Sequence, residues 1–207
     1  MLGQIPARDL PTSLIFTLHD DNVGLVPQLA TGSLHEITQD MRRHGWSGFS
    51  TRYWLIGDHD PCVAYLARAA WDPAATPEAV CRDQIRATCG DACIEDMLVA
   101  LREVEQATVQ LEWLGLGFTF PVPGMITKHW TPDPLPEELA AVRGYYERAL
   151  TAAQRAREKT STRGRQFVDY WIGRLEFGIG YFDAVAAVRW EARDEADGKR
   201  EESRRHA

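Results

Sequence analysis

The sequence lacks the short motifs that mark the common nucleotide-binding and hydrolytic sites. Its 207 residues contain no phosphate-binding loop, no dinucleotide-binding fingerprint, no HExxH and no GxSxG. No motif therefore assigns the chain to the P-loop, Rossmann, zincin or α/β-hydrolase classes. Any function has to be inferred from less specific clusters of side chains.

The sequence also lacks long hydrophobic runs and an excess of positive charge. No apolar run approaches the ~18 residues of a membrane span, and the first residues show no basic segment followed by an apolar one. We therefore expect no membrane association and no signal peptide. The formal net charge is −7, which argues against nucleic acid as a partner because phosphate binding needs clustered positive charge.

Cysteine is scarce, with four residues at positions 62, 81, 89 and 93. The spacing from Cys89 to Cys93 is too loose for a zinc knuckle, and no histidine pair follows it at ligand spacing. We expect buried free thiols, which favour a reducing, cytoplasmic location. No cofactor is predicted.

The N-terminal part predicts two strands that alternate with helices. A short apolar run at 13–18 has strand length, and a second runs over 48–56. Between them lie a loop containing Pro27 and a helix that has Ser33 as its cap and that Gly45 ends. This βαβα order predicts a parallel sheet, with ligands at the carboxyl ends of the strands. Two strands are too few for such a sheet, so we expect further strands in another chain or in a longer protein.

From residue 61 onward the periodicity is helical. Helices are predicted over 61–71, 77–89, 91–115, 136–159 and 165–193, with Asp60 as the cap of the first and Thr76 as the cap of the second. The last three suit an antiparallel bundle, and glycines in the final helix are expected to admit a close neighbour. The predicted fold is mainly α. It consists of two βα units over 1–60, a helical domain over 61–193 and a charged, disordered tail over 194–207.

The first candidate site follows the first strand and comprises His19, Asp20, Asp21 and Asn22. Carboxylates, an amide and an imidazole suit sugar hydroxyls, acid–base chemistry or a metal ion. The same residue types are ordinary turn formers that cap the next element. Both interpretations stay open.

The second candidate site follows the second strand and comprises Arg52, Trp54, Asp58 and His59. Arg52 is predicted within a buried strand, where it needs a carboxylate partner. Trp54 suits stacking on a sugar ring or packing in the core. Asp58 and His59 are the preferred functional candidates.

The third candidate site is the loop that contains Lys128, His129 and Trp130. A cation, an imidazole and an aromatic plate together suit ligand binding, although such loops also simply cover a core. A fourth polar group on the last helix includes Asp169, Tyr170 and Arg174. We expect that group to pack and to form ion pairs with the rest of the protein.

The residues 16–22 and 48–60 resemble the seventh and eighth units of a (β/α)8-barrel glycoside hydrolase. The chain after residue 60 resembles the helical C-terminal domains that follow such barrels in bacterial enzymes of the α-glucuronidase and hexosaminidase type. The resemblance implies two terminal units of a TIM-type barrel and a carbohydrate substrate. It places the sites named above on the C-terminal face of the barrel.

The resemblance implies hydrolysis of O-glycosyl bonds, a reaction that needs two carboxyl groups. Asp21 and Asp58 are the catalytic candidates, although in many such barrels the pair lies on earlier strands. The substrate-binding candidates are His19, Asp20, Asn22, Arg52, Trp54, His59, Lys128, His129 and Trp130. Two alternatives remain. One is a helical interaction module that forms a homo-oligomer through its N-terminal strands, and the other is a metal-dependent hydrolase using His19, Asp21, Asp58 and His59.

Overall fold

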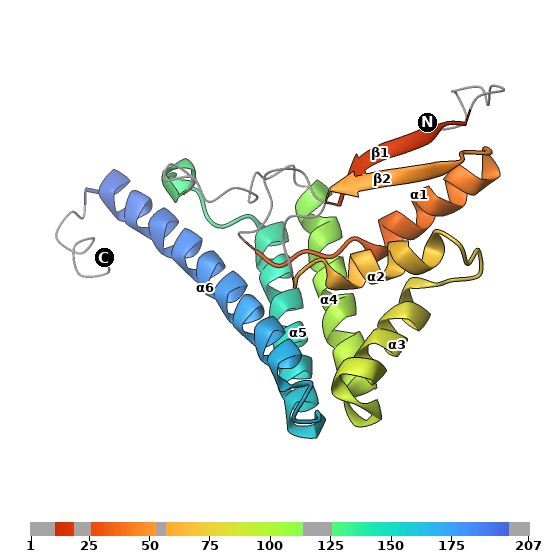
Figure 1. Cartoon of the computed structure of the whole chain (residues 1–207). Helices are drawn as coiled ribbons and strands as arrows, with labels where there is room; N and C mark the ends of the chain where they lie inside the picture. The colour runs from red at the N-terminus through yellow and green to blue at the C-terminus, as the bar shows by residue number, and fades with distance from the viewer. Residues whose placement is uncertain (1–10, 19–25, 53–56, 114–125, 199–207) are drawn as a thin grey trace.

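The computed structural model describes residues 11–18, 26–52, 57–113 and 126–198. Within these residues six α-helices and two short strands form a mainly helical protein (Figure 1). The predicted mainly α class is confirmed. No helix in these ranges combines the length and the apolar character that crossing a membrane requires.

The two strands flank the first helix and pair in parallel. Strand β1 spans Ser13–Thr17, α1 spans Thr31–Arg43 and β2 spans Gly48–Arg52. The strands pair in register, with Ser13 opposite Gly48 and Thr17 opposite Arg52. The predicted parallel βαβ unit is therefore present, and the remainder of the predicted second strand, 53–56, lies outside the described residues.

Helices α2 and α3 follow the second strand. Helix α2 spans Asp60–Ala69 and α3 spans Pro77–Cys89. The side chain of Thr76 accepts a hydrogen bond from the N–H of Ala79 at 3.3 Å, which confirms its predicted role as a helix cap. Asp60 is instead the first residue of α2, so its predicted capping position is wrong by one residue.

Three long helices form the largest part of the protein. Helix α4 spans Ile94–Trp113, α5 spans Glu137–Lys159 and α6 spans Arg165–Ala196, with short 3₁₀ turns η2 at Asp91–Cys93 and η3 at Ile126–His129. Helix α5 packs against both α4 and α6 and runs antiparallel to them (Figure 1). Helix α6 extends beyond its predicted end into the predicted tail, of which residues 199–207 are not described.

One of the glycines of α6 admits a close neighbour. A Cβ atom on Gly178 would lie 3.1 Å from Pro27 and 3.3 Å from the ring of Tyr146. A Cβ on Gly173 or Gly180 would meet nothing within 4 Å. The predicted close approach is therefore made at Gly178 only.

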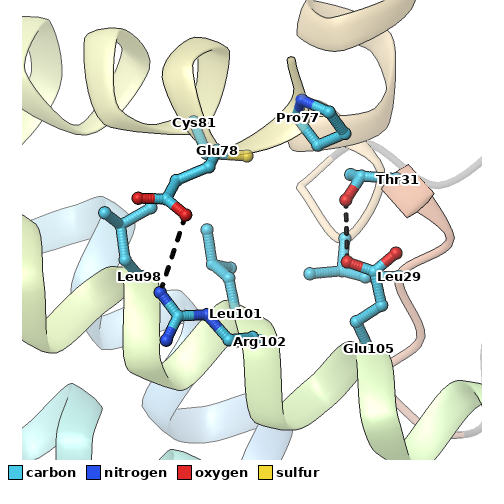
Figure 2. A pocket seen from close by; sticks show the side chains of 9 residues that line it. All are labelled: Leu29, Thr31, Pro77, Glu78, Cys81, Leu98, Leu101, Arg102 and Glu105. Atoms are coloured by element: carbon cyan, nitrogen blue, oxygen red, sulfur yellow. Dashed lines mark hydrogen bonds and ion pairs between the residues drawn. The ribbon is translucent and has the colours of Figure 1, made fainter. Parts of the chain in front are cut away.

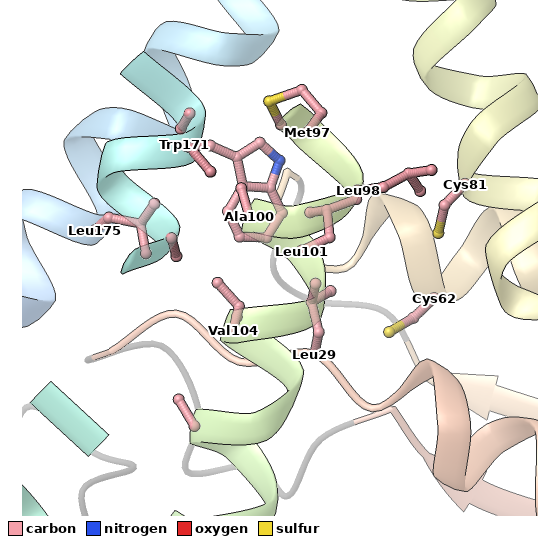
Figure 3. Close-up of a cluster of buried hydrophobic side chains, with 14 of the residues drawn as sticks. Leu29, Cys62, Cys81, Met97, Leu98, Ala100, Leu101, Val104, Trp171 and Leu175 are labelled. Atoms are coloured by element: carbon pink, nitrogen blue, oxygen red, sulfur yellow. The ribbon is translucent and has the colours of Figure 1, made fainter. Parts of the chain in front are cut away.

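A single hydrophobic core joins the N-terminal unit to the long helices. Figure 3 shows Trp171 and Leu175 of α6 pointing toward α4, while Cys62 and Cys81 lie on its other side. Leu18, Val26, Leu29 and Leu34 belong to the same core, which therefore extends across residue 60. The proposed division into domains at that residue stays a prediction.

The segment 26–29 is irregular yet buried. The carbonyl of Pro27 accepts a hydrogen bond from the hydroxyl of Tyr146 at 2.7 Å, and the N–H of Leu29 donates to the hydroxyl of Thr108 at 2.8 Å. Side chains of α5 and α4 thus satisfy backbone groups that would otherwise be buried without partners. This segment fixes the N-terminal unit to the long helices.

Candidate functional site

The buried carboxylate of Asp58 connects the loop before α2 to helix α6. It accepts hydrogen bonds from Arg174 Nε at 3.0 and 3.1 Å and from Arg174 Nη2 at 2.7 Å. The hydroxyl of Tyr170 donates to the same carboxylate at 2.8 Å. Tyr170 and Arg174 lie one turn apart on α6, so both side chains lie on the same face of that helix and donate to the same carboxylate.

The loop before Asp58 has a backbone shape that favours glycine. Gly57 has φ +106°, in the left-handed region, and a Cβ there would lie 2.4 Å from the ring of Tyr170. The carboxylate of Asp60 accepts a hydrogen bond from the N–H of Gly57 at 3.2 Å. Gly57 and Asp60 together shape the loop in which the Asp58 carboxylate meets the hydroxyl of Tyr170.

His59 is buried beside this cluster, with an exposed fraction of 2%. Burial lowers the pKa of its imidazole from 6.5 to about 4, although the neighbouring carboxylates of Asp58 and Asp60 act to raise it. The imidazole is therefore neutral at pH 7. A proton on His59 would destabilise this part of the fold.

The geometry of the cluster suits a structural clamp. The side chain of Asp58 is 3% exposed and that of Arg174 is 20% exposed. Three donors already occupy the carboxylate, whereas a general acid or base has to reach a proton of its substrate. In this arrangement Asp58 joins two parts of the protein, and its catalytic role stays a prediction.

The remaining candidates near the strands are placed only in part. His19, Asp20, Asp21, Asn22 and Trp54 lie outside the described residues. Arg52 is exposed at the end of β2, so the prediction that it lies in a buried strand is wrong. The reason is that the described sheet has two strands, and only one of its faces is covered by helices.

The loop candidates lie along a different part of α6. His129 is 8% exposed, Trp130 is 49% exposed, and the side chain of Lys128 is not described. Arg189 of α6 donates to the carbonyl of Pro134 at 3.0 Å, which holds this loop to the helix. Arg189 is 15 residues beyond Arg174, roughly 22 Å along a helix, so this loop and the Asp58 clamp are held by separate stretches of α6.

From the sequence we expected Tyr170 and Arg174, the partners of Asp58, only to pack and to form ion pairs. That general role is confirmed, since Arg174 pairs with Asp58 and Asp169 pairs with Arg157. The spacing of Tyr170 and Arg174 on one helix face is a signal of a joint role. Nothing in the local sequence connects them to a carboxylate that lies 112 and 116 residues away, respectively.

A small cavity between α1, α3 and α4 contains charged side chains that already have partners (Figure 2). The carboxylate of Glu105 accepts hydrogen bonds from the hydroxyl of Thr31 at 2.8 Å and the N–H of Gly32 at 2.5 Å. It thereby caps α1, whose own N-cap residue makes no side-chain hydrogen bond. The volume of about 130 Å³ is below the range of small-molecule sites, roughly 300–1,000 Å³. This cavity therefore marks the place where α1, α3 and α4 meet, and we assign no ligand to it.

Metal and thiol chemistry find little support in the described part of the chain. There, no group of three histidine, cysteine or acidic residues is placed to hold a metal ion, and two members of the metal hypothesis, His19 and Asp21, lie outside it. All four cysteines are free and buried, as predicted. Burial raises the pKa of the Cys62 and Cys81 thiols to about 12, so they are protonated and weakly nucleophilic at pH 7.

Comparison with protein-family models, with curated proteins and with solved structures finds no match to this chain. The function therefore rests on the geometry of the chain's own residues.

Proposed function

We propose that this protein is a helical interaction module that dimerises through its N-terminal strands, with β1 of one copy pairing with β1 of a second copy. The observation that carries this proposal is Ile15, which is 78% exposed at the centre of β1. A large aliphatic side chain at the middle of an edge strand favours association with another chain.

The two faces of the sheet differ in their surroundings. Leu14 and Phe16 of β1 alternate with Ile15, and the ring of Phe16 lies 5.6 Å from that of Phe49 on β2. That face packs against the core. Ile15 lies on the other face of the sheet, where the residue beside it on β2 is the exposed Ser50.

The two edges of the sheet differ in charge. Within the described residues the sheet contains only β1 and β2, so each strand has one edge to which no described strand is paired. Natural edge strands avoid unwanted pairing by carrying charged residues, as β2 does with the exposed Arg52. Strand β1 has the sequence SLIFT, with no charge, which favours it as the pairing edge.

A two-fold axis through Ile15 makes the contact self-complementary. In an antiparallel β1–β1 pair centred there, Ile15 faces its own copy, Leu14 faces Phe16, and Ser13 faces Thr17. The result is a four-stranded sheet with strand order β2-β1-β1-β2. The two isoleucine side chains cover each other on the open face.

The test is the mass of the protein in solution, measured by light scattering and sedimentation at micromolar concentrations. We expect a dimer for the native chain and a monomer for Ile15→Lys. Val109→Lys is the matched control, since Val109 is an aliphatic residue on α4 that is 40% exposed. A native monomer, or a dimer that survives Ile15→Lys, would overturn the proposal.

A second candidate function is the C-terminal part of a carbohydrate-active glycoside hydrolase. It is supported by the parallel β1–α1–β2 order followed by α2, which is the order that the terminal units of a TIM-type barrel require. In this proposal Asp21 and its neighbours at the strand ends contact the sugar. The helical part then forms the domain that follows the barrel.

Hydrolysis of aryl glycosides and aryl glucuronides tests the second candidate. We expect turnover that Asp21→Asn reduces by at least about tenfold, the size of effect produced by losing a positioned acid or base. Asp40→Asn is a matched control on the exposed face of α1, where Asp40 pairs with Arg43. Absence of turnover and of sugar binding would count against this candidate.

A further inference from the structure

A shallow groove between α2 and α3 contains an exposed tryptophan. The two helices are neighbours along the chain and in space (Figure 1). The groove has a volume of about 370 Å³, within the range for small-molecule sites, roughly 300–1,000 Å³. Its lining includes Ala64 and Arg68 of α2, Trp71 just after that helix, and Val80, Asp83 and Gln84 of α3. None of these residues belongs to the Asp58 clamp or to the proposed pairing edge.

Trp71 presents its indole ring to solvent, with an exposed fraction of 72%. The guanidinium of Arg68 lies over the ring, 5.4 Å from its centre, and covers one of its two faces. Because the side chain is largely exposed with that contact in place, the other face of the ring is open. A large aromatic ring exposed in a groove offers a surface on which a ligand can bury apolar area.

The polar side chains of the same groove have hydrogen-bonding groups to offer. Nη2 of Arg68 lies 3.9 Å from Oδ2 of Asp83, too far for a hydrogen bond. The other oxygen of Asp83 accepts from Arg86 at 2.9 Å, which leaves Oδ2 available as an acceptor. The side-chain amide of Gln84 forms no hydrogen bond with another described residue. The groove thus supplies both donors and acceptors.

This combination suits a neutral pyranose sugar. One face of a glucose-type ring consists of C–H groups that stack on an indole, and its hydroxyls both donate and accept. The opposite charges of Arg68 and Asp83 balance, so the groove attracts a charged ligand only weakly. We propose that the groove binds a neutral glucose-type oligosaccharide, with one sugar ring on the open face of Trp71 and its hydroxyls on Asp83 and Gln84. This site depends on neither of the functions proposed above.

A proline-rich peptide is another ligand that stacks on exposed tryptophan. Grooves for such peptides are lined by several aromatic side chains. Trp71 is the only aromatic residue among the described residues that line this groove. The surroundings of the ring therefore favour the sugar, and a proline peptide becomes a control in the test.

The test uses the full chain and saturation-transfer NMR, with cellotriose, maltotriose and the linear polyol sorbitol as probes. We expect a trisaccharide to bind, with the strongest saturation on the C–H protons of one ring face. Sorbitol has hydroxyls but no ring, so it should not bind. Trp71→Ala should weaken binding by about tenfold or more and Gln84→Ala by about fivefold. Trp190→Ala is the matched control, since Trp190 on α6 is also 72% exposed.

Several results would overturn the proposal. They are no binding of either trisaccharide at about 10 mM, unchanged binding in Trp71→Ala, and an equal loss in Trp71→Ala and Trp190→Ala. Sorbitol or hexaproline binding as tightly as the trisaccharides would also overturn it. A trisaccharide that binds at Trp71 without being hydrolysed would support this groove and count against the hydrolase candidate.

Discussion

Asp58 and Arg174 form a side-on ion pair across 116 residues of sequence, with Nη2 2.7 Å from one carboxylate oxygen. The pair joins the end of the N-terminal unit to the last helix. Tyr170 adds a hydrogen bond from the next turn of the same helix. The strength and the environment of this clamp lead to the first three predictions below.

Arg174→Met is expected to destabilise the protein by about 3–5 kcal/mol, because it leaves the buried Asp58 carboxylate without its charged partner. Urea denaturation followed by circular dichroism measures the change. The control is Arg157→Met, which removes an exposed pair with Asp169 whose side chains are 55% and 45% exposed. That variant should cost less than about 1 kcal/mol, and equal effects of the two variants would show that burial does not strengthen the clamp.

Stability is expected to fall as the pH decreases from 6.5 toward 4, because of His59. The pKa of this residue is about 4 in the folded protein and near 6.5 in the unfolded chain. Between these values the unfolded chain binds more protons, so lower pH favours unfolding, and below about pH 4 this contribution no longer changes.

His59→Gln tests this assignment because glutamine does not titrate. The free energy of unfolding of the native protein should lose roughly 2–3 kcal/mol across that window, and the variant should lose correspondingly less. Native and variant profiles with the same slope would contradict the assignment to His59.

Gly57→Ala is expected to destabilise the protein by more than about 2 kcal/mol, since it combines a left-handed backbone with a contact against Tyr170. The Cβ would lie 2.4 Å from the ring of that tyrosine. Tyr170→Ala should relieve part of the cost in a double variant. Gly173→Ala on α6, where a Cβ meets nothing within 4 Å, should instead be neutral or stabilise by up to about 1 kcal/mol.

Glu105→Gln is expected to cost about 1–2 kcal/mol by weakening the cap that α4 provides for α1. The negative charge complements the positive end of the helix, and the amide keeps only part of that interaction. Thermal unfolding measures the difference. Glu95→Gln is the control on the same helix, where the side chain is 77% exposed and pairs with Arg82, and its change should be within about 1 kcal/mol.

Elements with strong local signals were predicted from the sequence. Helix α3, Pro77–Cys89, follows from the cap Thr76 directly before it, the proline at its first position and Gly90 directly after it. The two strands and their parallel pairing followed from their apolar runs and from the helix between them. Such features depend on neighbours in the chain, so the sequence alone contains the information.

The position of Arg52 and the partners of Asp58 could not be predicted in this way. Periodicity identified β2, but the exposure of Arg52 depends on how many strands lie beside it. Likewise, Asp58 was singled out as an acid after a strand. Its neighbours Tyr170 and Arg174 come from a helix whose direction is set by packing against α5.

Local chemistry in the sequence thus determined a mainly helical chain that begins with a parallel βαβ unit. Tertiary structure decided which polar groups are buried together. Residues 26–29 show the reason most directly: a stretch with the composition of a loop is buried because Tyr146 and Thr108 supply partners for its backbone. Those hydroxyls lie 119 and 79 residues away along the chain, and only the packed helices bring them there.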